Sequence, residues 1–281
     1  MLARAPASSA NLGPGFDVLA VALQLHLEVS VELADSFSIT SQGCGAGLYD
    51  DERHLGAVVA AKVLGHDRFA ISVTSEIPLS RGLGSSAALA LAAAAAAGSS
   101  AALEVATDVD GHAENAAASQ LGGLVAAGIR DGHVVARGLT LDDAWRFVVV
   151  VPDEKLATER ARRVLPIQVP FADAVHNLSA LALLIDGLAD HERFDPSAMD
   201  DRLHQPYRMA LVPHAAPLLA VLRDAGASGS CWSGAGSTML GLSTFQTAPT
   251  VAAAATAFLI EHSVPGEVLV LEADRVGLVL R

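Results

Sequence analysis

Apolar and polar residues alternate along residues 18–40, where Leu27, Val29, Val31 and Leu33 are spaced two apart. A period of two is typical of half-buried strands, so we expect strands in this stretch. Three shorter apolar runs predict further strands, and a proline at position 152 ends the last of them. These runs are residues 69–74, 134–135 and 147–151.

Helices are predicted where good helix formers fill a longer stretch. The clearest case is residues 85–97, which are mainly alanine and follow a glycine-rich turn. The last two apolar runs, 268–272 and 276–280, predict a terminal hairpin. Helices and strands are mixed without a steady βαβ order, which favours an α+β fold over a doubly wound sheet. The other helices expected are residues 113–118, 172–188 and 247–260.

The charge of the chain narrows the choice of partners. Its 281 residues include 31 acidic and 18 basic side chains, a formal net charge of −13. Nucleic acids and anionic membranes select basic surfaces, so neither is expected as a partner. The longest apolar run, residues 87–97, is shorter than the ~20 residues of a membrane span. No secretory pattern opens the sequence, and the two cysteines form no CxxC pair, so a reduced, cytoplasmic protein is expected.

Residues 78–88 contain the most informative loop, between an expected strand and an expected helix. Gly82 and Gly84 allow a sharp turn that turns backbone N–H groups outward, and Ser85 and Ser86 add hydroxyl groups. A helix N-terminus adds unpaired donors, so the loop could hold phosphate, although such turns also occur without a function. No GK[ST] follows the glycines, which excludes a Walker A loop.

Two further glycine-rich loops are residues 11–17 and 233–238. The first has Asn11 and Asp17 on either side of two glycines, where they could meet one small polar ligand or simply cap a turn. The second is by itself an ordinary tight connection. Neither loop contains a lysine, and the chain has only Lys62 and Lys155.

Taken together, the three loops resemble the motifs of the GHMP kinase superfamily. Residues 81–88 are similar to its nucleotide loop, residues 233–238 to its third motif, and residues 6–17 to the first motif of homoserine kinases. Residues 112–115 (HAEN) resemble the family's His-x-Asp-Asn stretch. Residues 205–208 (QPYR) resemble its Glu-Pro-x-Arg segment, and Thr158 and Arg162 match Thr-x-x-x-Arg.

The resemblance implies a two-lobed fold with the active site between the lobes. Residues 1–145 would form a nucleotide-binding lobe like ribosomal S5 domain 2, and residues 146–281 a ferredoxin-like α+β lobe. The implied activity is ATP-dependent phosphorylation of the L-homoserine hydroxyl in threonine biosynthesis, with ATP and Mg²⁺ as cofactors. The family often forms homodimers, but the sequence does not decide the assembly.

The resemblance also implies roles for single residues. Glu104 stands eight residues before His112, where the family has its magnesium-binding glutamate, and Ser86 would be the second metal ligand. Asp17 suits the substrate ammonium, and two arginines suit its carboxylate. The implied substrate-binding residues are Asn11, Asp17, His112, Asn115, Arg162 and Arg208, and the implied catalytic residues are Asn115, Glu104 and Arg162. The implied nucleotide-binding residues are Pro78, Ser80, Arg81, Gly82, Leu83, Gly84, Ser85, Ser86, Gly234 and Gly236.

Four positions depart from the family pattern: His54 and Ser237 replace asparagine and proline, Gln205 replaces glutamate, and Glu114 replaces aspartate. These departures affect the shape of the nucleotide site more than the chemistry. The two arginines do not separate the candidate substrates, so two alternatives stay open. The chain could phosphorylate another small alcohol, such as mevalonate, shikimate or threonine, or it could bind nucleotide without turnover. Because the amide of Asn115 cannot act as a base, the substrate proton is expected to leave through phosphate or water.

Overall fold

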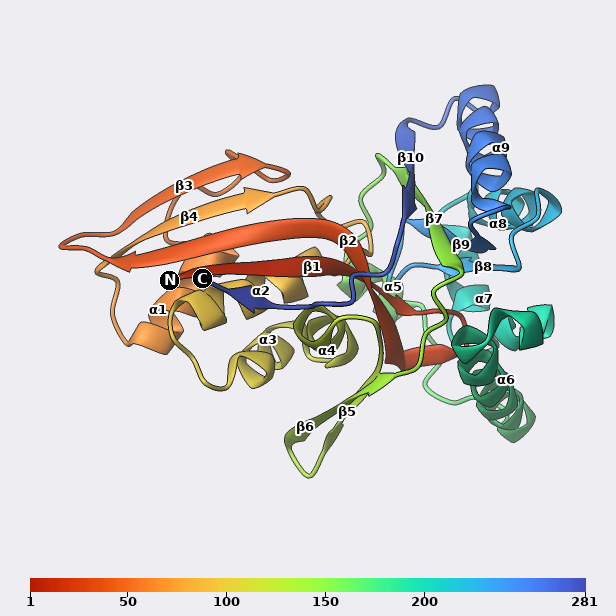
Figure 1. Ribbon diagram of the computed structural model, residues 1–281, viewed down its shortest axis with the longest axis horizontal. Coiled ribbons are helices and arrows are strands. Elements are labelled where there is room, and N and C mark those ends of the chain that lie inside the picture. The colour runs from red at the N-terminus through yellow and green to blue at the C-terminus, as the bar shows by residue number, and fades with distance from the viewer.

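A mixed sheet of seven strands forms the first lobe of the computed structural model, which describes residues 1–281 (Figure 1). Its strand order is β11-β1-β2-β4-β3, and the β5–β6 hairpin joins it through β2. Neighbouring strands are antiparallel except β3 and β4. The strands are β1 (Leu2–Asn11), β2 (Gly15–Leu33), β3 (Ser38–Gly43), β4 (Phe69–Ser75), β5 (Leu124–Arg130), β6 (His133–Leu139) and β11 (Val279–Leu280).

Four helices cover one face of this sheet (Figure 1). The alternation in β2 explains which face: Leu27, Val29 and Val31 are buried, whereas Glu32 on the opposite side is exposed. Helix α2 has 10 of its 12 residues buried, so its alanines pack against neighbours on nearly every side. The helices are α1 (Leu55–Leu64), α2 (Ser85–Ala96), α3 (Ala102–Asp110) and α4 (Glu114–Leu121).

The second lobe contains an antiparallel four-stranded sheet in the order β10-β7-β9-β8. With α5, α6 and α7 inserted between β7 and α8, the order along the chain is β7–α8–β8–β9–α9–β10, which confirms the expected ferredoxin-like lobe. The strands are β7 (Trp145–Pro152), β8 (Gly229–Trp232), β9 (Met239–Thr244) and β10 (Gly266–Leu271). The helices are α5 (Thr158–Arg163), α6 (Phe171–Ala189), α7 (Gln205–Arg208), α8 (Ala215–Asp224) and α9 (Ala248–Glu261).

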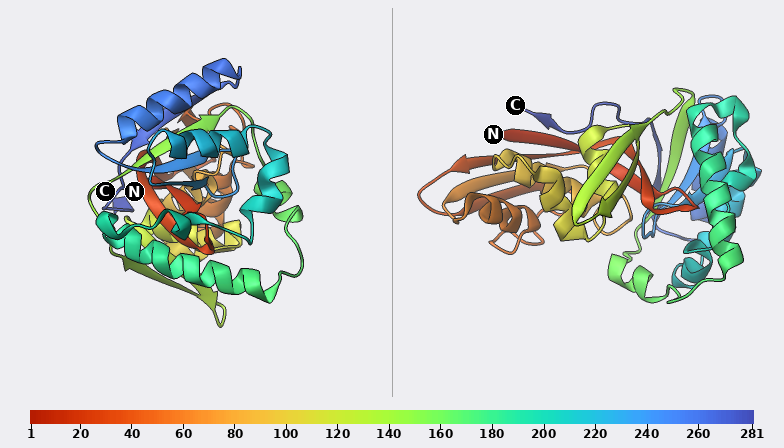
Figure 2. Two further views of the ribbon diagram at one scale, coloured as in Figure 1. Left: turned by 90° about the vertical axis from the view of Figure 1, so that its right-hand side faces the viewer. Right: turned by 90° about the horizontal axis from the view of Figure 1, so that it is seen from below.

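The predicted terminal hairpin is wrong. Strand β10 pairs with β7 in the second sheet, and β11 pairs with β1 in the first, so the last 10 residues return to the first lobe. The two chain ends lie side by side as a result, with Leu2 and Arg281 exchanging two backbone hydrogen bonds (Figures 1 and 2). An apolar period of two predicts strands but not which sheet each strand joins.

The turn between β1 and β2 belongs to the first lobe and contacts the second. Asn11, Leu12 and Gly13 all have positive φ angles there, which lets two long strands reverse in a tight turn. The turn reaches the second lobe, where the Asn11 side-chain amide donates to the Gly234 carbonyl at 2.8 Å. The first motif of the sequence is therefore held against the third.

Candidate active site

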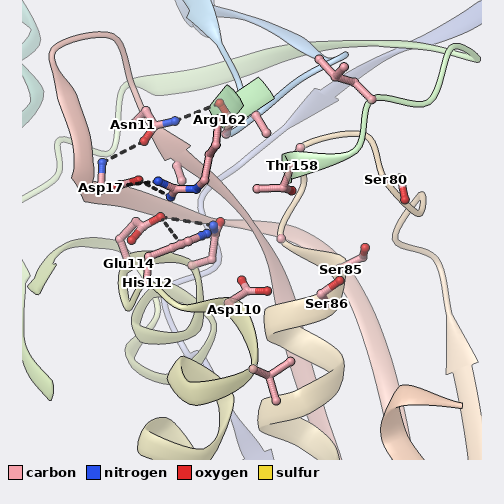
Figure 3. A pocket seen from close by; sticks show the side chains of 18 of the residues that line it. Asn11, Asp17, Ser80, Ser85, Ser86, Asp110, His112, Glu114, Thr158 and Arg162 are labelled. Carbon is pink, nitrogen blue, oxygen red and sulfur yellow. Dashed lines mark hydrogen bonds and ion pairs between the residues drawn. The ribbon is translucent and has the colours of Figure 1, made fainter. Parts of the chain in front are cut away.

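A cavity of about 270 Å³ lies between the two lobes (Figure 3). The first lobe contributes the β1–β2 turn, the loop before α2 and the segment that joins α3 to α4. The second lobe contributes α5, α7 and the turn between β8 and β9. Only 4 of its 19 lining residues are hydrophobic, so the cavity suits a small polar ligand.

The loop before α2 needs its glycines. Gly82 and Gly84 have φ angles of +80° and +67°, a region in which other residues are strained. A Cβ atom on Gly82 would overlap the carbonyl oxygen of Ser233, and one on Gly84 would overlap the hydroxyl of Ser8. The first N–H groups of α2 have no partners within the helix and carry the positive end of its dipole. The loop and helix together form a site for an anion.

Six of the ten residues predicted to bind nucleotide line this cavity, and four do not. Leu83 is buried beneath the loop, and the Arg81 guanidinium donates to the carbonyl groups of Leu79 and Asp153. Gly236 donates its N–H to Ser233, and Pro78 precedes the loop. Pro78, Arg81 and Leu83 therefore shape the loop before α2, and Gly236 shapes the turn between β8 and β9. The six that line the cavity are Ser80, Gly82, Gly84, Ser85, Ser86 and Gly234.

A second cavity of about 220 Å³ shares Ser80, Ser85 and Ser86 with the first. Half of its 16 lining residues are hydrophobic, among them Leu55 and Leu89. A ligand with a flat apolar group and an anionic group could therefore occupy both cavities with the serines between its two ends.

Asp17 and Arg162 form an ion pair in the lining of the first cavity. Arg162 donates Nη1 and Nη2 to the two Asp17 carboxylate oxygens at 3.0 and 2.8 Å, a bidentate pair. Asn11 fixes the backbone of Asp17, because its side-chain oxygen accepts the Asp17 N–H at 3.0 Å. Both charged side chains are about one-third exposed, so a ligand can reach them.

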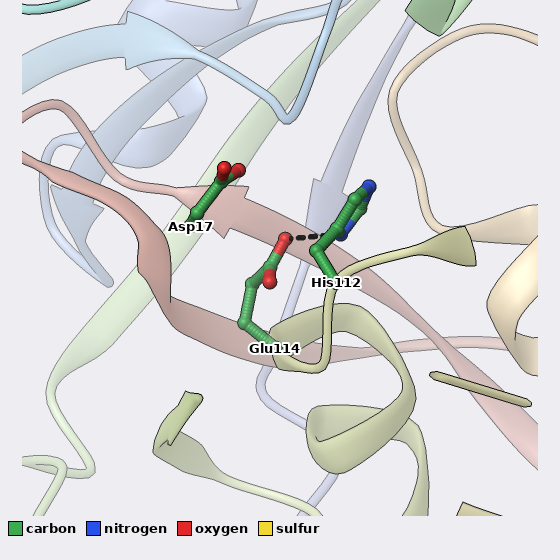
Figure 4. Close-up of side chains that lie close together, drawn as sticks. All are labelled: Asp17, His112 and Glu114. Carbon is green, nitrogen blue, oxygen red and sulfur yellow. Dashed lines mark ion pairs between the residues drawn. The ribbon is translucent and has the colours of Figure 1, made fainter. Parts of the chain in front are cut away.

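His112 and Glu114 form a second charged group beside Asp17 (Figure 4). Nδ1 of His112 lies 2.7 Å from Oε1 of Glu114, and the Glu114 side chain is 1% exposed. Burial opposes a charge on His112, but the adjacent carboxylates of Glu114 and Asp110 outweigh it and raise the pKa of His112. Oε2 of Glu114 is buried without a partner, so this cluster can accept a further hydrogen bond from a cation.

Asn115 and Arg208 also lie where the sequence predicts them. Asn115 accepts a hydrogen bond from the Ser8 hydroxyl at 3.0 Å and lines the cavity beside α2. Arg208 is 2% exposed, and its guanidinium donates to the carbonyl groups of Ala161 and Gly234. Burial lowers the pKa of Arg208 to about 10, so it stays charged at neutral pH.

Glu104 does not lie in this cavity, contrary to its expected role as a metal ligand. It is exposed on α3, whereas Asp110 at the end of the same helix lines the cavity. Six residues turn an α-helix by about 600°, so the two carboxylates project from different sides, and about 9 Å of helix separates them. Figure 3 shows the Asp110 carboxylate near Ser86, and burial raises its pKa. Of the two carboxylates compared on α3, Asp110 is therefore the one that lines the cavity.

Three residues around the site were missed as candidates: Phe16, Asp110 and Glu114. Asp110 and Glu114 lie two residues before and two residues after His112, so the local sequence could have indicated both. The Phe16 ring lies 5.6 Å from the Arg162 guanidinium carbon and 5.3 Å from that of Arg208. Nothing in the local sequence could have predicted this contact, which depends on how the lobes meet.

The sequence matches two models of known families. "GHMP kinases N terminal domain" matches residues 53–132, and "GHMP kinases C terminal" matches residues 176–261. The homoserine kinase of Desulfitobacterium hafniense is 38% identical over 98% of this chain and 97% of that protein. The chain belongs to the homoserine kinases. The homoserine kinase of Streptomyces coelicolor is 37% identical over 90% of this chain and 87% of that protein.

Solved structures agree with this family. A homoserine kinase from Cytophaga hutchinsonii superposes with a TM-score of 0.86 at 26% identity, covering 99% of this chain and 96% of that one. The L. major mevalonate kinase superposes with a TM-score of 0.72 at 13% identity, covering 97% of this chain and 95% of that one, and shares the fold. The expected GHMP kinase fold and the identification as a homoserine kinase are both confirmed.

Proposed function

We propose that this homoserine kinase transfers the γ-phosphoryl group of ATP to the hydroxyl of L-homoserine, giving ADP and O-phospho-L-homoserine on the route to threonine. One observation supports this most strongly: a single cavity joins an anion-binding loop to a cluster of arginines and carboxylates. Homoserine is a zwitterion with a primary hydroxyl. Its recognition needs an anion for the ammonium and planar cations for the carboxylate, beside a phosphate site.

The charged cluster divides between the two ends of the substrate. Asp17 and the unpartnered oxygen of Glu114 suit the ammonium, and Arg162 and Arg208 suit the carboxylate. In the free enzyme Asp17 and Arg162 neutralise each other. A zwitterion brings one charge for each of them, so both remain paired when it binds.

ATP would extend across both cavities. The N–H groups at the start of α2 and the glycine loop suit its phosphates, and the more apolar cavity suits its base. Neither Lys62 nor Lys155 lines the site, so no lysine neutralises the phosphates. Backbone N–H groups and a divalent cation must do so instead.

Asp110 and Ser86 are the residues that would hold Mg²⁺, since both offer hard oxygen ligands on the same wall of the cavity. The Asp110 carboxylate is half-buried and makes no hydrogen bond to the protein, which is unfavourable unless a cation compensates it. Bound Mg²⁺ supplies charge neutralisation for the phosphates.

The reaction itself requires alignment more than covalent chemistry. The homoserine oxygen forms a bond to the γ-phosphorus as the bond between that phosphorus and the bridging oxygen breaks, and ADP leaves with the electron pair. Asn115, next to the loop, would orient the hydroxyl, and the proton leaves to phosphate or water. Its amide has no basic group, so we assign it orientation alone.

ADP release in the presence of ATP and Mg²⁺ tests this function with a panel of L-homoserine, L-threonine, mevalonate, shikimate and galactose. Turnover on L-homoserine far above the other alcohols is the expected result. Turnover on another alcohol instead would overturn the substrate assignment but keep the kinase. ATP binding without turnover on any of them would overturn both.

The metal assignment has a matched pair of variants on one helix. Asp110→Asn should lower Mg²⁺-dependent kcat by about 10²–10³-fold, because a neutral amide binds Mg²⁺ more weakly than a carboxylate and the charge of the phosphates is then less well neutralised. Glu104→Gln, on an exposed position of α3, should leave kcat within about two-fold. The reverse ranking, with both proteins folded by circular dichroism, would return the metal site to Glu104.

We further propose that the enzyme works in the cytoplasm as a homodimer, without a nucleic-acid or membrane partner. By length and composition alone, α6 could cross a membrane. This is weak evidence for a membrane span, because Leu184 and Leu188 of α6 pack into the hydrophobic core. Phe171, Val175 and Leu178 form an exposed apolar stripe on its other side. A second copy would cover that stripe with an identical one. Light scattering should show a dimer for the wild type and a monomer for Leu178→Glu.

A further inference from the structure

We propose that His204 is a positioning residue, which fixes the guanidinium of Arg208 and links it to the loop that carries Asp17. This inference rests on the proposed function, because it assumes that Arg208 receives the carboxylate of homoserine. His204 is fully buried directly before α7, and Arg208 is the last residue of that helix. Neither the charge pattern nor the motifs of the sequence assign it a role.

One side of the Arg208 guanidinium has no protein partner, and its direction is fixed by the hydrogen bonds of the other side. Nε donates to Ala161 at 3.2 Å, and Nη1 donates to Gly234 at 3.1 Å and to Nδ1 of His204 at 3.1 Å. A guanidinium has five N–H groups, so these three bonds leave the two on Nη2 without a protein partner. Arg208 lines the cavity, and Nη2 is therefore the group available to a ligand carboxylate.

The contacts of His204 allow a single tautomer. Arg208 can only donate, so Nδ1 of His204 must accept its hydrogen bond. Nε2 lies 2.8 Å from the carbonyl oxygen of Gly13, which can only accept, so Nε2 carries the proton. A neutral imidazole with its proton on Nε2 satisfies both partners at once. No other protonation state does so.

The hydrogen bond from His204 Nε2 reaches the turn that precedes Asp17. Gly13 lies in the β1–β2 turn, four residues before Asp17. Phe16, at the start of β2, stacks on the His204 ring, with centroids 5.0 Å apart and planes inclined by 24°. The Phe16 ring also lies beneath both guanidinium groups. One imidazole therefore connects the loop that offers an anion with the arginine that offers a cation.

Asp201 fixes the backbone around His204. Its carboxylate accepts backbone N–H groups from Leu203, His204 and Gln205 at 2.9, 3.0 and 2.6 Å, which fixes the start of α7. His204 can then set the distance between Asp17 and Nη2 of Arg208. We expect this arrangement to favour a ligand whose ammonium and carboxylate are bonded to the same carbon, as in an α-amino acid.

The test compares L-homoserine with 3-amino-1-propanol, which has the same ammonium and hydroxyl but no carboxylate. In His204→Leu, we expect KM for homoserine to rise about 10–100-fold, the worth of a hydrogen bond to a charged group. Expected kcat and KM for ATP stay within about three-fold, as does kcat/KM for 3-amino-1-propanol. His204→Asn keeps an acceptor near the position of Nδ1 and should recover part of the loss.

Two further variants separate positioning from general damage. His214→Leu removes another partly buried histidine that lines neither cavity, and it should change none of these constants. Arg208→Gln should raise KM for homoserine, and adding His204→Leu should raise it no further, because His204 acts through Arg208. Additive effects, or equal loss on both alcohols, would overturn the proposal. Failure of the wild type to phosphorylate homoserine would instead overturn the proposed function.

Discussion

Gly84→Ala tests how the loop before α2 is held, and its cost can be worked out from the surroundings of Gly84. An alanine at φ +67° costs about 1 kcal/mol as left-handed backbone. Its Cβ would overlap Ser8 Oγ and lie 3.1 Å from Asn115 Oδ1, an overpacking that costs about 1–3 kcal/mol. Separating Ser8 from Asn115, now hydrogen-bonded at 3.0 Å, adds about 1 kcal/mol. The free energy of unfolding should therefore fall by about 4 kcal/mol.

Gly65→Ala is the matched control, because Gly65 has φ +75° but nothing within 4 Å of an added Cβ. It should lose only the cost of the backbone, about 1 kcal/mol. Urea unfolding at pH 7 measures both values, and kcat/KM should fall only in Gly84→Ala, where Asn115 is displaced. Adding Ser8→Ala to Gly84→Ala removes the overlapping oxygen and should restore part of the stability. Equal losses for the two glycines would refute the account of the clash.

Three other outcomes are expected. Ala93→Leu, within the fully buried run of α2, should lower the melting temperature through an overpacking cost of about 1–3 kcal/mol, measured by calorimetry. Asp17→Asn should raise KM for homoserine by about 10²-fold, since it removes the anion for the ammonium and leaves Arg162 unpaired; steady-state kinetics at saturating ATP would show this. Burial lowers the pKa of His204 to about 4, so the unfolded chain binds a proton below pH 6.5 that the native state excludes. Unfolding free energy should therefore fall by roughly 3 kcal/mol between pH 6.5 and pH 4, and by less in His204→Asn, as urea titrations at several pH values would show.

Local patterns predicted the elements whose sequences carry a strong apolar period or helix propensity. Residues 69–74 and 85–97 form β4 and α2 almost to the residue, because apolar period and helix propensity act over a few positions. Strand β1 was missed, since its alternating small residues give almost no hydropathy signal. Pairing of β10 and β11 depends on strands more than 100 residues away, which no window along the chain can include.

The candidate site divides in the same way. Motifs brought Asp17, Arg162 and Arg208 correctly to one cavity, because each lies on a short segment whose sequence is distinctive. Glu104 was assigned by its spacing from His112, but the turn of α3 carries it away from the site and leaves Asp110 there. Spacing along a chain is a poor measure of direction once the residues lie on a helix.

The return of β11 to the first sheet affects the order in which the lobes can form as the chain is synthesised. The second sheet uses strands from one continuous stretch, residues 145–271, and has all of them before the end of the chain emerges. The first sheet begins at residue 2 but lacks its edge strand until residues 279–280 appear. Until then the outer edge of β1 keeps unpaired backbone groups, to which another unfinished chain could add a strand. The lobe that is translated first is thus the last to be completed.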